Sequence, residues 1–302
     1  MRTTFRLHRA VALALALAFA CAASTRAPLR AQGPRERTMY ASAVDEKGEP
    51  VDRLGPNDFI IREDGAAREV LRVTPATEPI DIAILIDNGA ASDGVIPRVR
   101  EALASFITAM LKGKQIALVG LADRPTIFVD YTQNMKRLQD GIGLLWPRSQ
   151  SGTTLLDAIY EVARGLEKRD TPRAVIIPVI TDGGDYANRQ YQQVTDEVKQ
   201  AGAAIHAITV GTFAPSDDDD LRNRARVLSE GTRLSGGQRV TLLTPSSVQQ
   251  ALERLGRELS SQYKVVYGRP ESLIPPEKIV VSAGRTGVTM RGTLERGTGN
   301  AK

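Results

Sequence analysis

The chain alternates short, almost continuously apolar runs with stretches whose apolar residues recur at helical spacing. Residues 80–87, Ile-Asp-Ile-Ala-Ile-Leu-Ile-Asp, and residues 174–180 are rich in β-branched side chains. Such runs are typical of central strands in a parallel sheet that helices cover on both faces. Further strands are expected at 115–121, 126–131, 203–210 and 240–243, and helices at 95–110, 153–166, 191–198, 221–228 and 248–259. The alternation predicts an α/β fold: a doubly wound, mostly parallel sheet with helices on both faces.

A second, β-type pattern lies on both flanks of this region. Strands are expected at 39–44, 58–62 and 68–73, and again at 263–267, 278–282 and 288–291. Because the first set is too small to fold alone, we expect the late strands to complete one small β module with it. The predicted segments are an N-terminal β segment at 38–79, the sheet domain at 80–261, C-terminal strands at 262–293 and a tail at 294–302.

The N-terminus has the pattern of a secretory signal over residues 1–23. Three arginines within the first nine residues precede an apolar stretch of small residues and leucine, followed by small-residue cleavage patterns. We therefore expect an exported protein, periplasmic or extracellular, with residues 24–37 as a linker and without a transmembrane segment. The only cysteine, Cys21, lies in the signal, and a lipid anchor there is the less favoured alternative to simple removal.

Composition narrows the class of protein. The chain has 302 residues, of which 42% are hydrophobic and 25% charged, which is typical of a globular protein. Its formal net charge is +5. Because three of these charges lie on the signal's arginines, the remaining field is too weak to indicate a nucleic-acid partner.

The two most apolar strands each end in a carboxylate. Asp87 follows the first strand and is itself followed by Asn-Gly, and Asp182 follows the second and is followed by Gly-Gly. Ligands of open α/β sheets bind beyond the carboxyl ends of the strands, so these residues mark a candidate site. Both sequences are also strong turn signals, and the pattern alone leaves the two interpretations open.

Three segments together resemble a von Willebrand factor type A domain. They are Asp-Asn-Gly-Ala-Ala at 87–91, Ser-Gly-Thr-Thr-Leu-Leu-Asp-Ala-Ile at 151–159, and Ile-Thr-Asp-Gly-Gly-Asp at 180–185. The flanks at 45–51, 57–65 and 262–267 resemble exported type A proteins of soil acidobacteria, so the resemblance covers about residues 38–293. It implies a metal-ion-dependent adhesion site, with the pattern Asp-x-Ser-x-Ser, a Thr in a middle loop and the Asp of a Thr-Asp-Gly turn.

Carried over to this chain, the resemblance implies a degenerate metal site. Asp87, Thr153 and Asp182 match the pattern, but Gly89 and Ala91 stand where the family has its serines. Mg²⁺ prefers six oxygens in octahedral geometry, and losing even an outer-shell partner weakens metal binding by about 10–100-fold. We therefore expect Mg²⁺ or Mn²⁺ to bind weakly if at all. The alternative is that Thr153 or Thr154 caps the following helix and both aspartates accept backbone hydrogen bonds.

The resemblance implies a non-enzymatic protein-binding module for adhesion or assembly. Its partner, another protein, would contact the loops at the strand ends, and the residues expected on this rim are Asn88, Ser92, Thr154 and Asp185. The alternatives are a metal-dependent hydrolase that uses Asp87 and Asp182, and a purely structural subunit of an envelope assembly.

Three other features are given structural interpretations. His206, the only histidine beyond the signal, lies in an apolar strand and is expected to be a core or edge residue, so neither a Ser-His-Asp triad nor a histidine metal site is expected. The acidic run at 217–220 is expected to cap a helix and not to bind calcium. Trp146 is expected to anchor its loop against the sheet.

Overall fold

The computed structural model describes residues 35–169, 171–213, 216–270, 274 and 276–296. The expected signal at 1–23, Cys21, and the linker as far as residue 34 lie outside the described residues. Within the described part of the chain, no helix combines the length and apolar character needed to cross a membrane.

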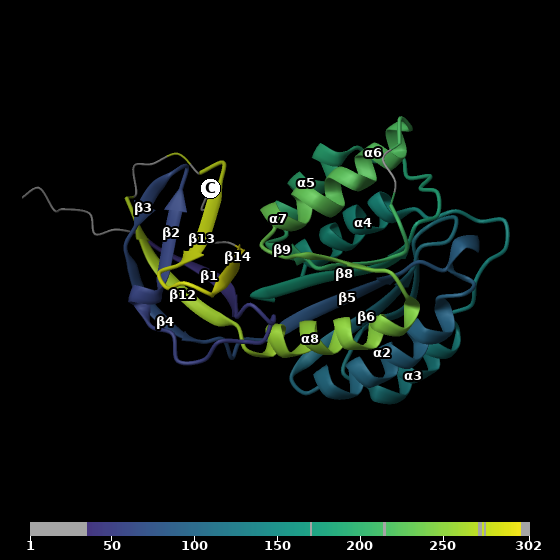
Figure 1. Ribbon diagram of the computed structural model, residues 1–302, viewed down its shortest axis with the longest axis horizontal. Helices are drawn as coiled ribbons and strands as arrows, with labels where there is room; N and C mark the ends of the chain where they lie inside the picture. The colour runs from purple at the N-terminus through teal and green to yellow at the C-terminus, as the bar shows by residue number, and fades with distance from the viewer. Residues whose placement is uncertain (1–34, 170, 214–215, 271–273, 275, 297–302) are drawn as a thin grey trace, which may run out of the picture. The chain divides into compact units, whose positions relative to one another are not determined.

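A seven-stranded sheet forms the centre of the larger region (Figure 1). Its strand order is β11-β10-β8-β5-β6-β7, with β9 also paired to β8. Its pairs are parallel except β6 with β7. Its strands are β5 (Ile80–Ile86), β6 (Lys114–Gly120), β7 (Thr126–Thr132), β8 (Arg173–Thr181), β9 (Ala203–Ile205), β10 (Ala207–Val210) and β11 (Arg239–Leu242). The predicted fold class, a doubly wound and mostly parallel sheet, is confirmed.

Helices cover both faces of this sheet, as the alternation of side chains in β5 requires. Ile82 and Ile84 pack with α2, α3 and α8, whereas Ala83 and Leu85 face α4, α5 and the segment from α6 to α7. The helices are α2 (Ile96–Met110), α3 (Met135–Gly143), α4 (Leu155–Glu167), α5 (Tyr191–Gln200), α6 (Asp219–Arg226), α7 (Thr232–Leu234) and α8 (Val248–Ser260), with a π-helical turn at Val227–Gly231 between α6 and α7. All seven β5 side chains are buried, which explains the unbroken apolar run.

Locally, the structure confirms the expectation for the acidic run and differs from the expectation for the strand at 203–210. The acidic run caps α6 as predicted, since the Asp218 carboxylate accepts from the backbone amides of Asp220 (2.9 Å) and Leu221 (3.1 Å). The strand expected at 203–210 is instead two strands, interrupted at His206. Helix α3 was not expected. Ser247 directly precedes α8 and makes no side-chain hydrogen bond that caps it.

The flanking strands form two antiparallel sheets, ordered β14-β1-β12-β4 and β13-β2-β3. They are β1 (Arg35–Val44), β2 (Phe59–Glu63), β3 (Ala66–Arg68), β4 (Val70–Pro75), β12 (Tyr263–Arg269), β13 (Ile279–Ala283) and β14 (Thr289–Leu294). Because β1 pairs with β12 and β14, and β2 with β13, the late strands complete the early ones as predicted. β1 begins inside the expected linker because Arg37 is buried in register with Tyr267, and β14 extends one residue into the expected tail.

Candidate functional site

The carboxyl ends of β5 and β8 lie side by side and bring the two strand-end loops together. The parallel register pairs Ile86 with Val179, and the Asp87 amide continues it by donating to the Val179 carbonyl at 2.9 Å. Asp87 is thereby placed at the centre of the sheet's carboxyl edge, where it is 3% exposed.

The Asp87 carboxylate receives four hydrogen bonds from the chain itself. Its Oδ1 accepts from the Gly89 amide (3.0 Å) and the Thr153 hydroxyl (2.8 Å). Its Oδ2 accepts from the Thr181 amide (3.1 Å) and the Thr181 hydroxyl (2.5 Å). Because a carboxylate offers about four lone-pair directions, these four donors use all of its capacity to accept hydrogen bonds. Asp87 therefore holds three loops together from inside.

The two threonines of the middle loop point inward and do not cap α4. Thr153 is 2% exposed and gives its hydroxyl proton to Asp87. The Thr154 hydroxyl donates to the Leu121 carbonyl at 2.9 Å, and no side-chain hydrogen bond caps the helix. The alternative in which either threonine caps α4 is therefore wrong, and both hydroxyls tie the loop to its neighbours.

The Asp182 carboxylate contacts the loop after β10. It is exposed and lies beside Gly211, where an added Cβ would be 2.7 Å from Oδ2. The Thr212 amide donates to it at 3.4 Å. Of the three residues expected as metal ligands, Asp87 and Thr153 hydrogen-bond each other, whereas the Asp182 side chain accepts from Thr212.

The side chains present do not fit a divalent cation site. Gly89 and Ala91 supply no side-chain oxygen, and every accepting direction of Asp87 already faces a donor of the chain. Across the described residues, no group of three or more His, Cys, Asp or Glu side chains is arranged to hold a metal. The local chemistry is that of a hydrogen-bonded loop junction.

All four residues expected on the rim are buried: Asn88, Ser92, Thr154 and Asp185 are each at most 5% exposed, so none of them presents an exposed side chain. Asn88 is 2% exposed, and its Oδ1 accepts from the amides of Leu121 and Ala122, both at 2.9 Å. Ser92 is 1% exposed and donates to the Gly89 carbonyl at 2.7 Å. Neither side chain is presented to a partner, and both stabilise the turn after β5.

Two buried charged residues belong to or contact the loop after β8: Asp185 lies in it, and Arg224 donates to its Gly183 carbonyl. Asp185 is 4% exposed, its Oδ1 accepts from the Ala187 amide (3.2 Å), and its Oδ2 has no hydrogen-bond partner among the described residues. Burial raises the pKa of Asp185 to about 7, and the nearby Arg224 opposes this rise. Burial lowers the pKa of Arg224, whereas the carboxylates of Asp185, Asp87 and Asp182 raise it.

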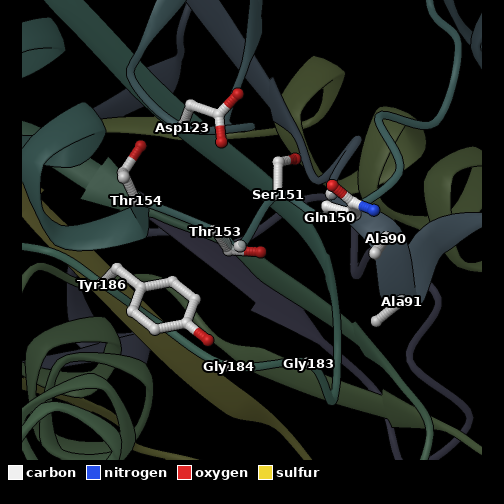
Figure 2. A pocket seen from close by; sticks show the side chains of 12 residues that line it. Ala90, Ala91, Asp123, Gln150, Ser151, Thr153, Thr154, Gly183, Gly184 and Tyr186 are labelled. Carbon is white, nitrogen blue, oxygen red and sulfur yellow. The ribbon is translucent and has the colours of Figure 1, made fainter.

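A hollow of about 540 Å³ lies between the loops at the carboxyl ends of the strands (Figure 2). In Figure 2, the Tyr186 ring and the pair Ala90–Ala91 lie on opposite sides, with Thr153 between them. The lining residues are Gly89, Ala90, Ala91, Asp123, Gln150, Ser151, Gly152, Thr153, Thr154, Gly183, Gly184 and Tyr186. The hollow is thus lined largely by glycine, alanine and short hydroxyl side chains.

Sequence reasoning missed Tyr186, which is the large exposed side chain of this hollow. Tyr186 is 68% exposed, and its ring packs on Gly152, where an added Cβ would be 1.9 Å from the ring. An aromatic residue directly after the Gly-Gly-Asp turn was the available signal.

Trp146 is exposed near the loop that leads into the hollow. It is 62% exposed, its indole donates to the Gly143 carbonyl at 3.0 Å, and the Arg100 guanidinium lies 4.5 Å from the ring centroid. The expectation that it anchors its loop against the sheet is therefore wrong.

Comparison with known families identifies the class of domain. The family model for the von Willebrand factor type A domain matches residues 81–252, more than half of the chain. The chain therefore belongs to the von Willebrand factor type A domain family. Domains of this family commonly mediate protein–protein interaction or adhesion.

Three solved structures are similar to this chain at low sequence identity. The von Willebrand domain of the type V pilus tip protein Mfa5 from Porphyromonas gingivalis is 14% identical, with 61% of this chain and 96% of that chain covered and a TM-score of 0.46. A von Willebrand factor type A protein from Catenulispora acidiphila is 11% identical, with 89% and 75% covered and a TM-score of 0.48. The PilB minor pilin of Streptococcus sanguinis is 10% identical, with 74% and 88% covered and a TM-score of 0.47. No curated protein matches the sequence.

Proposed function

We propose that this protein is an exported, non-enzymatic protein-binding module for adhesion or assembly, and that its partner docks on the hollow without a divalent metal. The observation that carries the proposal is the hollow itself: an open cavity of about 540 Å³ at the carboxyl edge of the sheet, with the exposed Tyr186 on its rim. Concave sites at this edge are the usual binding sites of doubly wound sheets.

The lining supports recognition of a side chain or loop of another protein. Because Gly152, Gly183 and Gly184 lack side chains, an incoming group can reach the backbone of the hollow closely. Tyr186 supplies a rigid aromatic surface with a polar end, the kind of residue that is enriched among the strongest contacts of protein interfaces. We therefore place the main contact at Tyr186, with Gln150 and Asp123 as polar neighbours.

Metal independence is the second part of the proposal. The four internal donors to Asp87 leave no accepting direction for a cation, and Asp182 faces Gly211 and Thr212 instead of the hollow. The same geometry gives the hydrolase alternative no support, because the Asp87 carboxylate is already hydrogen-bonded to four donors of the chain.

The experiment is crosslinking from the site in the organism that produces the protein. A photoreactive phenylalanine replaces Tyr186 in an affinity-tagged chain, and products are purified from the envelope with chelator or with magnesium and identified by mass spectrometry. We expect one protein to be crosslinked equally in both conditions. Capture that disappears in chelator would contradict metal independence.

A control position tests whether the partner contacts the hollow or another exposed apolar residue. The same photoreactive residue at Val280, which is 40% exposed on β13, tests whether the flanking sheets make the contact instead. Crosslinks from Val280 and none from Tyr186 would move the interface to the β module. Absence of any specific product at Tyr186 in the assembled envelope would favour the structural-subunit alternative, in which these loops bind nothing.

Export rests on the N-terminal sequence pattern. Mass spectrometry of the mature chain tests it directly and also distinguishes removal of the signal from a lipid on Cys21. A chain that retains residues 1–23 would contradict the proposed export.

A further inference from the structure

The serine and threonine hydroxyls that line the hollow have already donated their protons inside the chain. Thr153 donates to a carboxylate oxygen at 2.8 Å, and Thr154 and Ser151 donate to backbone carbonyls at 2.9 Å and 3.1 Å. A hydroxyl has one proton and two lone pairs. Each of these three side chains can therefore offer an incoming group only a hydrogen-bond acceptor.

Backbone amides of the lining residues are used in the same way, in hydrogen bonds to other groups of the chain. They are the amides of Gly89, Ala90, Asp123, Ser151, Thr153, Thr154 and Tyr186. A carbonyl that accepts one of these hydrogen bonds keeps a second lone pair. The hollow therefore offers a partner mainly acceptors, which are matched by a group rich in N–H donors.

One carboxylate supplies the charge of this lining. Of the described residues around the hollow, Asp123 alone has a charged side chain, and that side chain is 58% exposed. Arg148 approaches it, with Nη1 4.0 Å from Oδ2, but both side chains are more than half exposed, and such pairs are weak. Asp123 and Gln150 also have positive φ angles of 57° and 67°, a conformation that is uncommon outside glycine and that clusters at binding sites.

Tyr186 adds an aromatic ring that no cation of the chain occupies. Its ring packs on Gly152, and the residue is 68% exposed. Elsewhere, arginine guanidiniums lie between 4.2 Å and 5.6 Å from the ring centroids of Tyr40, Tyr131, Tyr160 and Tyr191. Within the described part of the chain, the Tyr186 ring has no such neighbour. The face of a tyrosine ring attracts a cation, so the ring is open to one that a partner brings.

We propose that the hollow receives a cationic side chain of the partner, a lysine or an arginine. Asp123 balances its charge, the lining oxygens accept from its N–H groups, and Tyr186 packs against its carbon stem and its charged end. This inference rests on the proposed function, because it specifies the chemistry of the partner at the same hollow. An acidic side chain would instead face Asp123 and oxygens that have no proton to donate.

The test is a nuclear magnetic resonance titration of the isotope-labelled mature protein with four capped tripeptides at constant ionic strength. Their central residue is lysine, arginine, glutamate or the uncharged norleucine. The lysine and arginine peptides should shift the amide signals of Gly152, Gly184 and Tyr186 saturably, and should bind at least about threefold more tightly than the other two. The proposal is overturned if the glutamate or norleucine peptide binds as tightly as the lysine peptide. It is equally overturned if neither cationic peptide gives a saturable shift.

Substitutions in the lining should change this binding in a graded way. Asp123→Asn keeps the shape of the side chain, and asparagine tolerates a positive φ, so the fold is kept while cationic peptides bind about two- to fivefold more weakly. Asp123→Lys should abolish their binding, and Tyr186→Leu should weaken it about two- to fivefold. Asp93→Asn, at an exposed aspartate outside the lining, is the matched control and should change nothing. Equal losses in Asp93→Asn and Asp123→Asn would overturn the proposal, because attraction to the whole protein's charge would then explain the binding.

The partner that is crosslinked from position 186 gives a second measurement, which separates this inference from the proposed function. Capture should be lost when Asp123→Lys is added to the photoreactive chain. Capture that is unchanged by Asp123→Lys would overturn the cationic contact and leave the binding function standing. Cationic peptides that bind the hollow, with no partner captured there in the envelope, would support the cation site and contradict the proposed function alone.

Discussion

Two clusters of buried polar side chains differ in how completely the chain satisfies their hydrogen-bonding groups. In the strand-end cluster of Asp87, Thr153 and Thr181, both carboxylate oxygens accept two hydrogen bonds each. In a second cluster, which we call the junction cluster, Glu258 of α8 accepts from Arg291 (2.8 Å) and Gln238 (2.9 Å) through Oε2 alone. Its Oε1 and both ring nitrogens of His206 have no partner within the described part of the chain.

The difference follows from how each cluster is assembled. The strand-end cluster is built from the ends of adjacent parallel strands, whose register the backbone fixes. The junction cluster joins the break between β9 and β10 to α8 and to Arg291 of β14, around a cavity of about 250 Å³. The comparison indicates that the strand-end cluster stabilises the loops of the site, whereas the junction cluster contains buried polar groups that lower stability.

Removal of the central acceptor should have the largest effect. Asp87→Ala leaves two backbone amides and two hydroxyls without their acceptor in a buried setting. We expect a loss of about 3–5 kcal/mol in the free energy of unfolding, measured by urea denaturation. Asp93→Ala, an exposed aspartate of the same loop, is the control and should change the value by less than about 0.5 kcal/mol. Similar small losses in both variants would contradict the central role of Asp87.

Two buried groups, His206 of the junction cluster and Asp185 of the loop after β8, should respond to acid in opposite directions. Burial lowers the pKa of His206 to about 4 from 6.5, so between these values the unfolded chain binds a proton that the folded chain does not. Its contribution to stability is therefore lost as the pH falls through this window. Burial raises the pKa of Asp185 to about 7 from 3.8, so its contribution is lost as the pH rises through that window.

Two variants should separate these opposite pH dependences of stability. The free energy of unfolding is measured by denaturation from pH 7 to pH 4. His206→Leu should become more stable relative to the wild type as the pH falls, by about 3 kcal/mol over the whole window. Asp185→Asn should become less stable relative to the wild type, by a comparable amount. Exposed carboxylates titrate equally in the wild type and both variants, so their effect cancels when the free energies of unfolding are subtracted. Parallel pH profiles would show that neither buried group titrates as its burial indicates.

The layered fold was predictable because a strand that is buried on both faces is apolar at nearly every position of its own short sequence. The almost continuously apolar runs of β5 and β8 indicate strands covered by helices on each side, and the segments with apolar residues at helical spacing supply those helices. Helix α3 was missed although Asn134 caps it and Leu138 and Ile142 are buried on its inner face. A nine-residue amphipathic segment carries too few periods to stand out.

The candidate site was predictable only in its location. The strand ends identified Asp87 and Thr153, whose side chains meet at 2.8 Å. The sequence did not indicate that Asn88 turns inward, because its acceptor meets backbone amides 33 and 34 residues away. The hydrogen bond from Arg224 to the Gly183 carbonyl could not be foreseen for the same reason, since the two residues are 41 positions apart.

A methyl group at Gly237 should show how rigid the junction region is. An added Cβ would lie 1.9 Å from the Ile205 carbonyl oxygen, a backbone atom next to His206 that cannot move without shifting β9. We expect Gly237→Ala to cost about 1–3 kcal/mol in urea denaturation, the usual range for overpacking. Gly143→Ala, where nothing lies within 4 Å of the added Cβ, is the matched control and should cost less. Equal effects would show that the junction relaxes easily.

The smallest effect on stability is expected at Gly152, although the added methyl would be just as close to a neighbour. There the Cβ would lie 1.9 Å from the Tyr186 ring, but this side chain belongs to a residue that is 68% exposed and can swing away. Gly152→Ala should therefore change the free energy of unfolding by less than about 1 kcal/mol. Because the ring leaves its position on the rim, partner crosslinking from a photoreactive residue at Gln150 should nevertheless fall. A stable variant with unchanged crosslinking would show that the position of Tyr186 does not matter for recognition, and the contact would then lie elsewhere on the hollow.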